Sequence, residues 1–312
     1  MNKRDALLNL IHGRAPLDYT PAAFFMHFDP AYHEGQAAVD KHLEYFRATG
    51  MDFVKIQFEQ RLPPGPTISE TGDWAQIPLY PASFFAPTVR VVEGLVQAVH
   101  EEALVVMTLY SPFMLAMQVA GGVDLEQHLR ENPDAVRQGL ATMVENKLTL
   151  VRGCMRAGVD GFYASTQGGE TSRFGDRSIF QRFIKPTDLA VWDEIKGCTF
   201  NILHVCDYVA GYDDLTPYLD YPGHVVNCSL ALGDRHLRPT EVADLFGRPY
   251  MGGLERKGVL ATGSPAEIRA TVDELLAGAP ERFILAADCT VPSDTPWENL
   301  KAAIDAAHQH RR

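Results

Sequence analysis

Short apolar runs alternate with amphipathic, helix-like stretches along the whole chain. The runs are rich in β-branched and aromatic residues, which is typical of buried parallel strands. Eight of them span residues 21–28, 52–59, 104–112, 161–169, 199–206, 224–230, 249–255 and 283–289. The helix-like stretches cover 34–50, 88–102, 113–158, 178–197, 213–219, 240–247, 265–277 and 297–310. Since no tight hairpin is evident between the runs, the pattern predicts parallel strands joined by helices.

Eight such units predict one closed (β/α)8 TIM barrel. An open, doubly wound sheet is the alternative, but no glycine-rich dinucleotide fingerprint follows the first run. We expect residues 1–312 to form one domain, because barrels of this length commonly do. The N-terminal MNKRDALLNLIHGRAP predicts a helical extension rather than a signal peptide. The Pro- and Gly-rich residues 61–87 predict a long loop over the barrel mouth, either a lid or a plain surface connection.

The composition is that of an ordinary globular protein, with 46% hydrophobic and 22% charged residues. A net charge of −12 without a Lys/Arg block argues against nucleic acid and anionic membranes as partners. No apolar stretch reaches the roughly 18–20 residues that a membrane span needs. Five cysteines, an odd number, indicate reduced thiols, so we expect a cytoplasmic protein acting on a small molecule. Whether the barrel pairs as a homodimer stays open.

Two predicted strands end in residues that bind metals. His204 and Cys206 close one run, and Cys289 closes another. Residues two apart on a strand face the same side, so His204 and Cys206 would share one site. One imidazole and two thiolates suit zinc, and three protein ligands leave a position open, as in catalytic sites. The alternative is that both cysteines are small buried apolar residues and His204 is a satisfied core histidine.

A fourth zinc ligand is not fixed by the sequence. Cys228, Glu255 or a water molecule could occupy that position. Polar side chains also end the other predicted strands, where barrel enzymes place their chemistry. We assign catalytic roles to Glu59, Tyr110 and Glu255, and substrate binding to His27, Gln167 and Asn227. The alternative for each of them is a polar side chain that only meets water, as strand ends often do.

Four segments resemble the uroporphyrinogen decarboxylase superfamily, and the likeness runs across essentially the whole chain. They are GRAPLDYTPAAFFM near the N-terminus, HVC at 204–206, RPYMGGLERKG at 248–258 and ILAADCTVPSDTPWENLKAAIDA near the C-terminus. The resemblance implies a (β/α)8 barrel, which agrees with the alternation of strands and helices.

One branch of that superfamily decarboxylates uroporphyrinogen III without metal or cofactor. It grips the substrate's carboxylates with arginines after the first strand, in a signature like FMRQAGR. Here the sequence is FMHFDPA, so His27 and Ala31 stand at the two arginine positions. The acidic group after the second strand of that branch corresponds loosely to Glu59. A metal-independent decarboxylase of this type would need a basic mouth, which the sequence does not obviously supply.

The other branch consists of zinc-dependent methyltransferases that act with corrinoid proteins. Its motif, His-x-Cys on one strand and a distant Cys on another, is matched by His204, Cys206 and Cys289. The resemblance implies a zinc ion that holds a thiol as thiolate, and a methyl group carried on the cobalt of a corrinoid partner. The chain departs from that branch at Asp207 and Asp288, where glycine is usual.

The sequence therefore predicts a zinc-dependent methyltransferase that moves a methyl group between a small substrate or thiol and a corrinoid protein. A metal-independent decarboxylase is the alternative. A non-catalytic zinc- or corrinoid-binding protein is a third reading, and it would require a closed site with four ligands.

Overall fold

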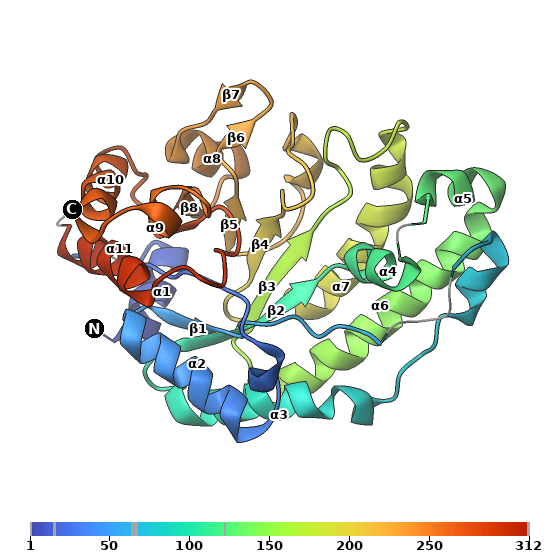
Figure 1. Ribbon diagram of the computed structural model, residues 1–312, viewed down its shortest axis with the longest axis horizontal. Helices are drawn as coiled ribbons and strands as arrows, with labels where there is room; N and C mark the ends of the chain where they lie inside the picture. Colours follow the sequence, from blue (N-terminus) through green and yellow to red (C-terminus); the bar gives the residue numbers. More distant parts are fainter. Residues whose placement is uncertain (1, 15–16, 64–67, 122, 311–312) are drawn as a thin grey trace.

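Seven parallel strands form one curled sheet in the computed structural model, which describes residues 2–14, 17–63, 68–121 and 123–310 (Figure 1). The strands are β1 (Phe53–Lys55), β2 (Leu104–Tyr110), β3 (Gly161–Thr166), β4 (Ile202–Val205), β5 (Val225–Cys228), β8 (Tyr250–Leu254) and β9 (Phe283–Ala287). They pair in that order, each parallel to the next. All seven fall within predicted runs, which confirms the α/β class and the parallel arrangement.

The first predicted strand along the chain, at 21–28, is not a regular strand. It forms only isolated parallel bridges, between Ala22 and Leu285 and between Met26 and Val291. Its backbone nevertheless bonds on both sides: the Ala23 amide donates to Leu285 O on β9, and the Phe28 amide donates to the carbonyl oxygen of residue 57, just after β1. The segment thus lies between the first and last strands of the sheet, and the prediction of eight regular strands is wrong here.

The reason is that side chains compete for the backbone donors of this segment. Pro21 has no amide hydrogen to give. The Ala22 amide donates to Asp52 Oδ2 at 2.7 Å, and the Met26 amide donates to Gln57 Oε1 at 3.1 Å. These donors are therefore not available for a continuous ladder.

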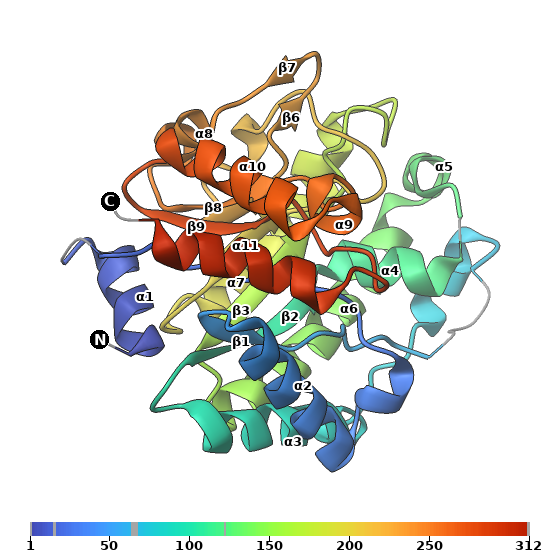
Figure 2. The same ribbon diagram turned by 60° about the vertical axis from the view of Figure 1, so that its left-hand side comes forward.

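Helices lie outside the curled sheet (Figures 1 and 2). They are α2 (Gly35–Thr49), α3 (Ala82–Val99), α4 (Pro112–Ala120), α5 (Leu125–Glu131), α6 (Pro133–Arg156), α7 (Lys185–Ile195), α8 (Pro239–Phe246), α9 (Val259–Thr262), α10 (Pro265–Ala277) and α11 (Trp297–Gln309). The long helical region predicted over 113–158 consists of three helices. Gly121, with a φ of 62°, ends α4, and the side chains of Asp124 and Asn132 cap the starts of α5 and α6. The helix predicted over 213–219 is only a 3-10 turn, η4 (Thr216–Tyr218).

The predicted N-terminal extension is confirmed as helix α1 (Lys3–His12). Lys3 Nζ donates to Gly50 O and Met51 O at 2.7 and 2.6 Å, just before β1. Arg4 Nη2 donates to Asp160 Oδ1 at 2.6 Å, just before β3. The helix therefore lies at the amino-terminal ends of the strands, away from the carboxyl ends that carry the predicted site.

Two loops differ from their predictions. Residues Ala231–Leu232 (β6) and Arg235–His236 (β7) form an antiparallel hairpin that the sequence analysis missed; its turn contains Gly233 with a φ of 56°. In the predicted loop 61–87, residues Thr71–Gln76 form the 3-10 helix η2 and α3 begins at Ala82; residues 64–67 lie outside the described part. No helix within the described ranges is long and apolar enough to cross a membrane.

Candidate metal centre

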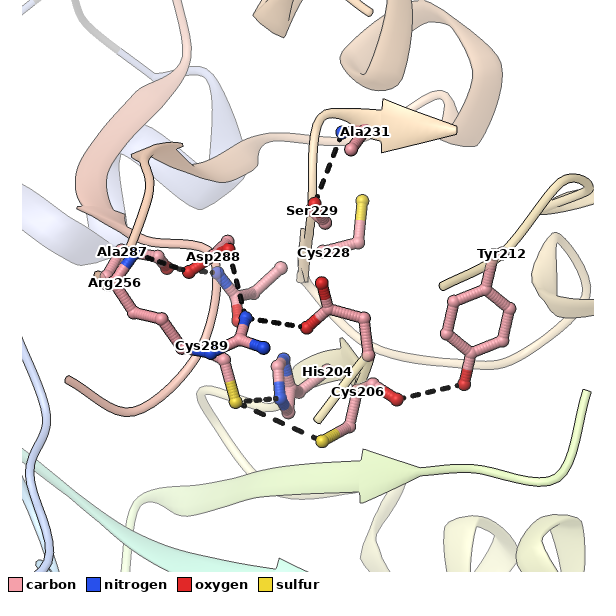
Figure 3. A network of polar contacts seen from close by, with 12 residues as sticks. His204, Cys206, Tyr212, Cys228, Ser229, Ala231, Arg256, Ala287, Asp288 and Cys289 are labelled. Carbon is pink, nitrogen blue, oxygen red and sulfur yellow. Dashed lines mark hydrogen bonds and ion pairs between the residues drawn. The ribbon is translucent and has the colours of Figure 1, made fainter. Parts of the chain in front are cut away.

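His204, Cys206 and Cys289 meet at the carboxyl end of the sheet, as predicted (Figure 3). His204 lies on β4, Cys206 directly follows that strand, and Cys289 lies two residues beyond β9. His204 Nε2 is 3.4 Å from Cys289 Sγ, and the two sulfur atoms are 4.0 Å apart. All three side chains are buried, and their donor atoms lie within 4.8 Å of one another.

These distances fit a tetrahedral zinc ion. Bond lengths of about 2.3 Å to sulfur and about 2.0–2.1 Å to nitrogen would place two sulfurs about 3.8 Å apart and sulfur about 3.6 Å from nitrogen. The observed 4.0 and 3.4 Å are close to those values. A disulfide would need about 2.05 Å between the sulfurs, and all five cysteines are free. The three residues therefore fit a zinc ion with little movement.

Stacking on Tyr163 and the contact between Nε2 and Cys289 Sγ orient the His204 ring. Its Nδ1 is buried and has no hydrogen-bond partner among the described residues. The Tyr163 ring stacks on the imidazole, with centroids 4.9 Å apart and planes 28° apart. Tyr163 in turn donates its hydroxyl to Asn227 Oδ1 at 2.5 Å. Metal-binding histidines usually have a polar partner at the second ring nitrogen; among the described residues His204 has none there, and the Tyr163 ring packs on the face of its imidazole instead.

The pKa values of the Cys206 and Cys289 thiols are shifted in opposite directions. Cys206 hydrogen-bonds to Cys289 and is buried, and both effects raise the pKa of Cys206 well above its ordinary value. The same hydrogen bond, with His204 and Arg256 nearby, holds the pKa of Cys289 well below its ordinary value. Gln167 Nε2 also donates to Cys206 Sγ at 3.4 Å. The protein thus favours a thiolate at Cys289, the form in which cysteine binds metals.

A cavity of about 340 Å³ lies in front of the three donors. Seven of the nine predicted site residues line it: His27, Glu59, Tyr110, Gln167, His204, Cys206 and Cys289. The other two lie elsewhere. Asn227 is fully buried behind Tyr163, and its amide donates to Met251 O and Ala287 O. Glu255 is exposed and does not line the cavity.

Neither protein candidate for the fourth ligand joins the three donors. Cys228 follows inward-facing Asn227 on β5 and packs in the hydrophobic core, where burial raises the pKa of its thiol to about 12. Glu255 also lies outside the cluster. Within the described part of the chain, the cluster that could hold a metal therefore consists of three protein donors. This count is typical of catalytic rather than structural zinc.

His27 and Glu59 form an ion pair at the cavity wall. His27 Nε2 lies 2.7 Å from Glu59 Oε1. Burial raises the pKa of Glu59, but the hydrogen bond from His27 and the charges of His27, Lys55 and Arg61 outweigh it, so this pKa is lowered overall. Glu59 is therefore an ionised carboxylate at neutral pH.

The residues that line the cavity also include three basic ones that the sequence analysis did not identify: Lys55, Arg61 and Arg173. The Lys55 ammonium lies 4.6 Å from the Phe25 ring centroid and 4.8 Å from that of Tyr163, and burial lowers its pKa to about 8. The mouth is thus more basic than the sequence indicated. A lysine inside the apolar run 52–59 was the signal that could have revealed it.

Residues 54–310 match the family described as Uroporphyrinogen decarboxylase (URO-D). The chain belongs to this family. The resemblance inferred from the sequence motifs is thereby confirmed. No curated protein sequence matches the chain.

Solved structures resemble the whole chain at low sequence identity. A methyltransferase from Methanosarcina mazei has a TM-score of 0.77 and 16% identity, and the match covers 98% of each chain. A B12-independent methionine synthase from Shewanella sp. W3-18-1 has a TM-score of 0.61 and 12% identity, covering 95% of this chain and 97% of that one. A putative vitamin-B12-independent methionine synthase from Listeria monocytogenes scores 0.58 with 14% identity, covering 94% and 97%. These likenesses show a shared fold.

Proposed function

We propose that this URO-D family member is a zinc-dependent methyltransferase, which moves a methyl group between a small substrate or thiol and a corrinoid protein. The observation that carries the proposal is the buried triad of His204, Cys206 and Cys289, with separations of 3.4 and 4.0 Å, at the wall of a cavity. The sequence resemblance to the zinc- and corrinoid-dependent branch supports it. The fold likeness to methyltransferases is consistent with it.

His204, Cys206 and Cys289 would hold the zinc, which when bound lowers the pKa of a thiol and keeps it as a thiolate. Two further residues of the chain, Gln167 and Glu59, take part in the reaction. Gln167 donates to Cys206 Sγ and so fixes that ligand. Glu59, kept anionic by His27 and Lys55, accepts the proton that the incoming thiol loses.

We infer that the substrate is small and carries an acidic group. A cavity of about 340 Å³ lies near the lower end of the roughly 300–1,000 Å³ found for ligand sites. Arg61 and Arg173 contribute guanidinium groups to its wall, and Lys55 contributes an ammonium. These cations pair well with a carboxylate or a sulfonate. Met114 and Met117 supply an apolar face for the remainder of the molecule.

A decarboxylase is the second candidate, because the three basic residues would also suit a carboxylate that is lost as CO2. That reaction makes no use of the triad of His204, Cys206 and Cys289. A tetrapyrrole substrate also demands more room than the cavity offers. The methyltransferase therefore remains the better account.

The test is methyl transfer from methylcobalamin to small thiols, followed by absorbance. Metal-stripped protein, zinc-reloaded protein and Cys206→Ala are compared with Cys228→Ala, whose buried cysteine lies outside the triad. We expect turnover only with zinc, loss in Cys206→Ala, full activity in Cys228→Ala, and preference for thiols that carry an acidic group over neutral ones. Equal turnover without metal, or CO2 release from a carboxylate substrate, would contradict the proposal.

A further inference from the structure

One arginine joins the two segments that carry the cysteine ligands. Arg256 Nη1 donates to Asp207 Oδ1 at 2.8 Å and to Asp288 Oδ2 at 3.0 Å. The Arg256 backbone amide donates to Asp288 Oδ1 at 2.8 Å. Asp207 directly follows Cys206, and Asp288 directly precedes Cys289. Figure 3 shows Arg256 and Asp288 beside Cys289. We call Asp207, Arg256 and Asp288 the clasp.

The clasp connects parts of the sheet that are not neighbours. β5 and β8 lie between β4, which precedes Cys206, and β9, which precedes Cys289. Arg256 lies just beyond the end of β8, so its side chain reaches past β5 to Asp207. The sheet hydrogen bonds do not pair β4 with β9 directly. The separation of the two sulfur atoms therefore depends on contacts beyond the ends of the strands.

The clasp is shielded from water, which sets it apart from the surface ion pairs. The side chains of Arg256, Asp207 and Asp288 are 14%, 15% and 13% exposed. In the surface pair of Arg238 and Glu241 the values are 77% and 36%. Exposed pairs contribute little, because water and salt screen them. The shielded clasp is therefore the stronger geometric constraint.

We propose that Arg256 is a positioning residue that holds Cys206 and Cys289 at a metal-binding separation before zinc binds. Two carboxylates that accept from the same nitrogen are close neighbours, and without Arg256 their like charges would repel each other. Since each carboxylate is adjacent to a ligand, this repulsion would move the two cysteines apart. The inference rests on the metal site of the proposed function.

The test measures zinc affinity by competition with a chromophoric chelator. Arg256→Met should weaken zinc binding by about 10- to 100-fold, the range found when the supporting shell of a metal site is lost. Arg256→Lys keeps a positive charge without the guanidinium fork, so its loss should be intermediate. Arg238→Met removes the surface ion pair and serves as the matched control, with unchanged affinity.

Stability measurements separate positioning from a merely structural role. If Arg256→Met does not fold, Arg256→Lys and Asp207→Asn are measured in its place. Asp207→Asn leaves the contact between Arg256 and Asp288 intact. Each of these variants should weaken zinc binding several-fold. A lower melting temperature of the metal-free variants with unchanged zinc affinity would overturn the proposal. If the wild type itself binds no zinc, the proposed metal site fails first. If the wild type binds and every clasp variant binds equally well, the clasp inference alone fails.

Discussion

Replacing Lys55 by methionine should stabilise the protein and impair its substrate site. Lys55 lies on β1 with its side chain facing the cavity, between the rings of Phe25 and Tyr163. Only 1% of the residue is exposed, and burial lowers its pKa from 10.5 to about 8, against the opposing charges of Glu59 and Cys289. A charged group kept in so buried a place destabilises the fold.

The magnitude follows from the difference in pKa between the folded and unfolded states. A pKa lowered to about 8 corresponds to a destabilisation of about 3 kcal/mol at pH 7. Between pH 8 and 10.5 the unfolded chain binds more protons than the folded protein, so stability rises with pH, and about 1 kcal/mol of the penalty is left at pH 10. Methionine removes the penalty but also the cation–π contacts, worth about 1–2 kcal/mol. We therefore expect Lys55→Met to be more stable by about 1–2 kcal/mol at pH 7, with the gain shrinking by pH 10.

Urea denaturation at pH 7 and pH 10 measures this difference. The matched control is Lys147→Met in α6, whose lysine is also buried, with a pKa lowered to about 7, but lies outside the cavity. Both variants should gain stability at pH 7, whereas binding of an acidic small thiol should fall only in Lys55→Met. A Lys55→Met protein less stable than the wild type at pH 7, or a gain independent of pH, would refute this reasoning.

Two further predictions follow from contacts of single residues. His27→Ala removes the partner 2.7 Å from Glu59, so the pKa of Glu59 should rise and the acid limb of the activity–pH profile should move to higher pH; an unmoved limb would argue against Glu59 as the base. In Gly139→Ala the new Cβ would lie 2.5 Å from Trp74 Cε3, so we expect a loss of about 1–3 kcal/mol by urea denaturation. Gly197→Ala, with nothing within 4 Å of its Cβ, is the control, and equal losses in both would contradict the packing argument.

The fold was predictable wherever a strand's own sequence determines it. The apolar runs at 104–112 and 283–289 became β2 and β9, since their residues bury both faces of a parallel strand. The run at 21–28 is also apolar, but Asp52 and Gln57 take two of its backbone donors. Such a contact between side chain and backbone leaves no periodic signal in the sequence.

The site was predictable where residue type and strand period coincide. His204 and Cys206 are two apart at the end of one extended segment, so their common direction follows from the pleat. Lys55 was missed because its role depends on the rings of Phe25 and Tyr163. Asp207 was noticed as unusual, but its partner Arg256 is 49 positions away in the chain, and the pairing requires the fold.

Zinc stoichiometry tests the central claim most directly. Purified wild-type protein, Cys206→Ala and Cys289→Ala are saturated with zinc, dialysed and analysed for metal, with Cys228→Ala as the buried-cysteine control. The account predicts one zinc per chain in the wild type and in Cys228→Ala, and none retained in the other two variants. A wild type that retains no zinc, or zinc kept by Cys206→Ala and Cys289→Ala, would contradict it.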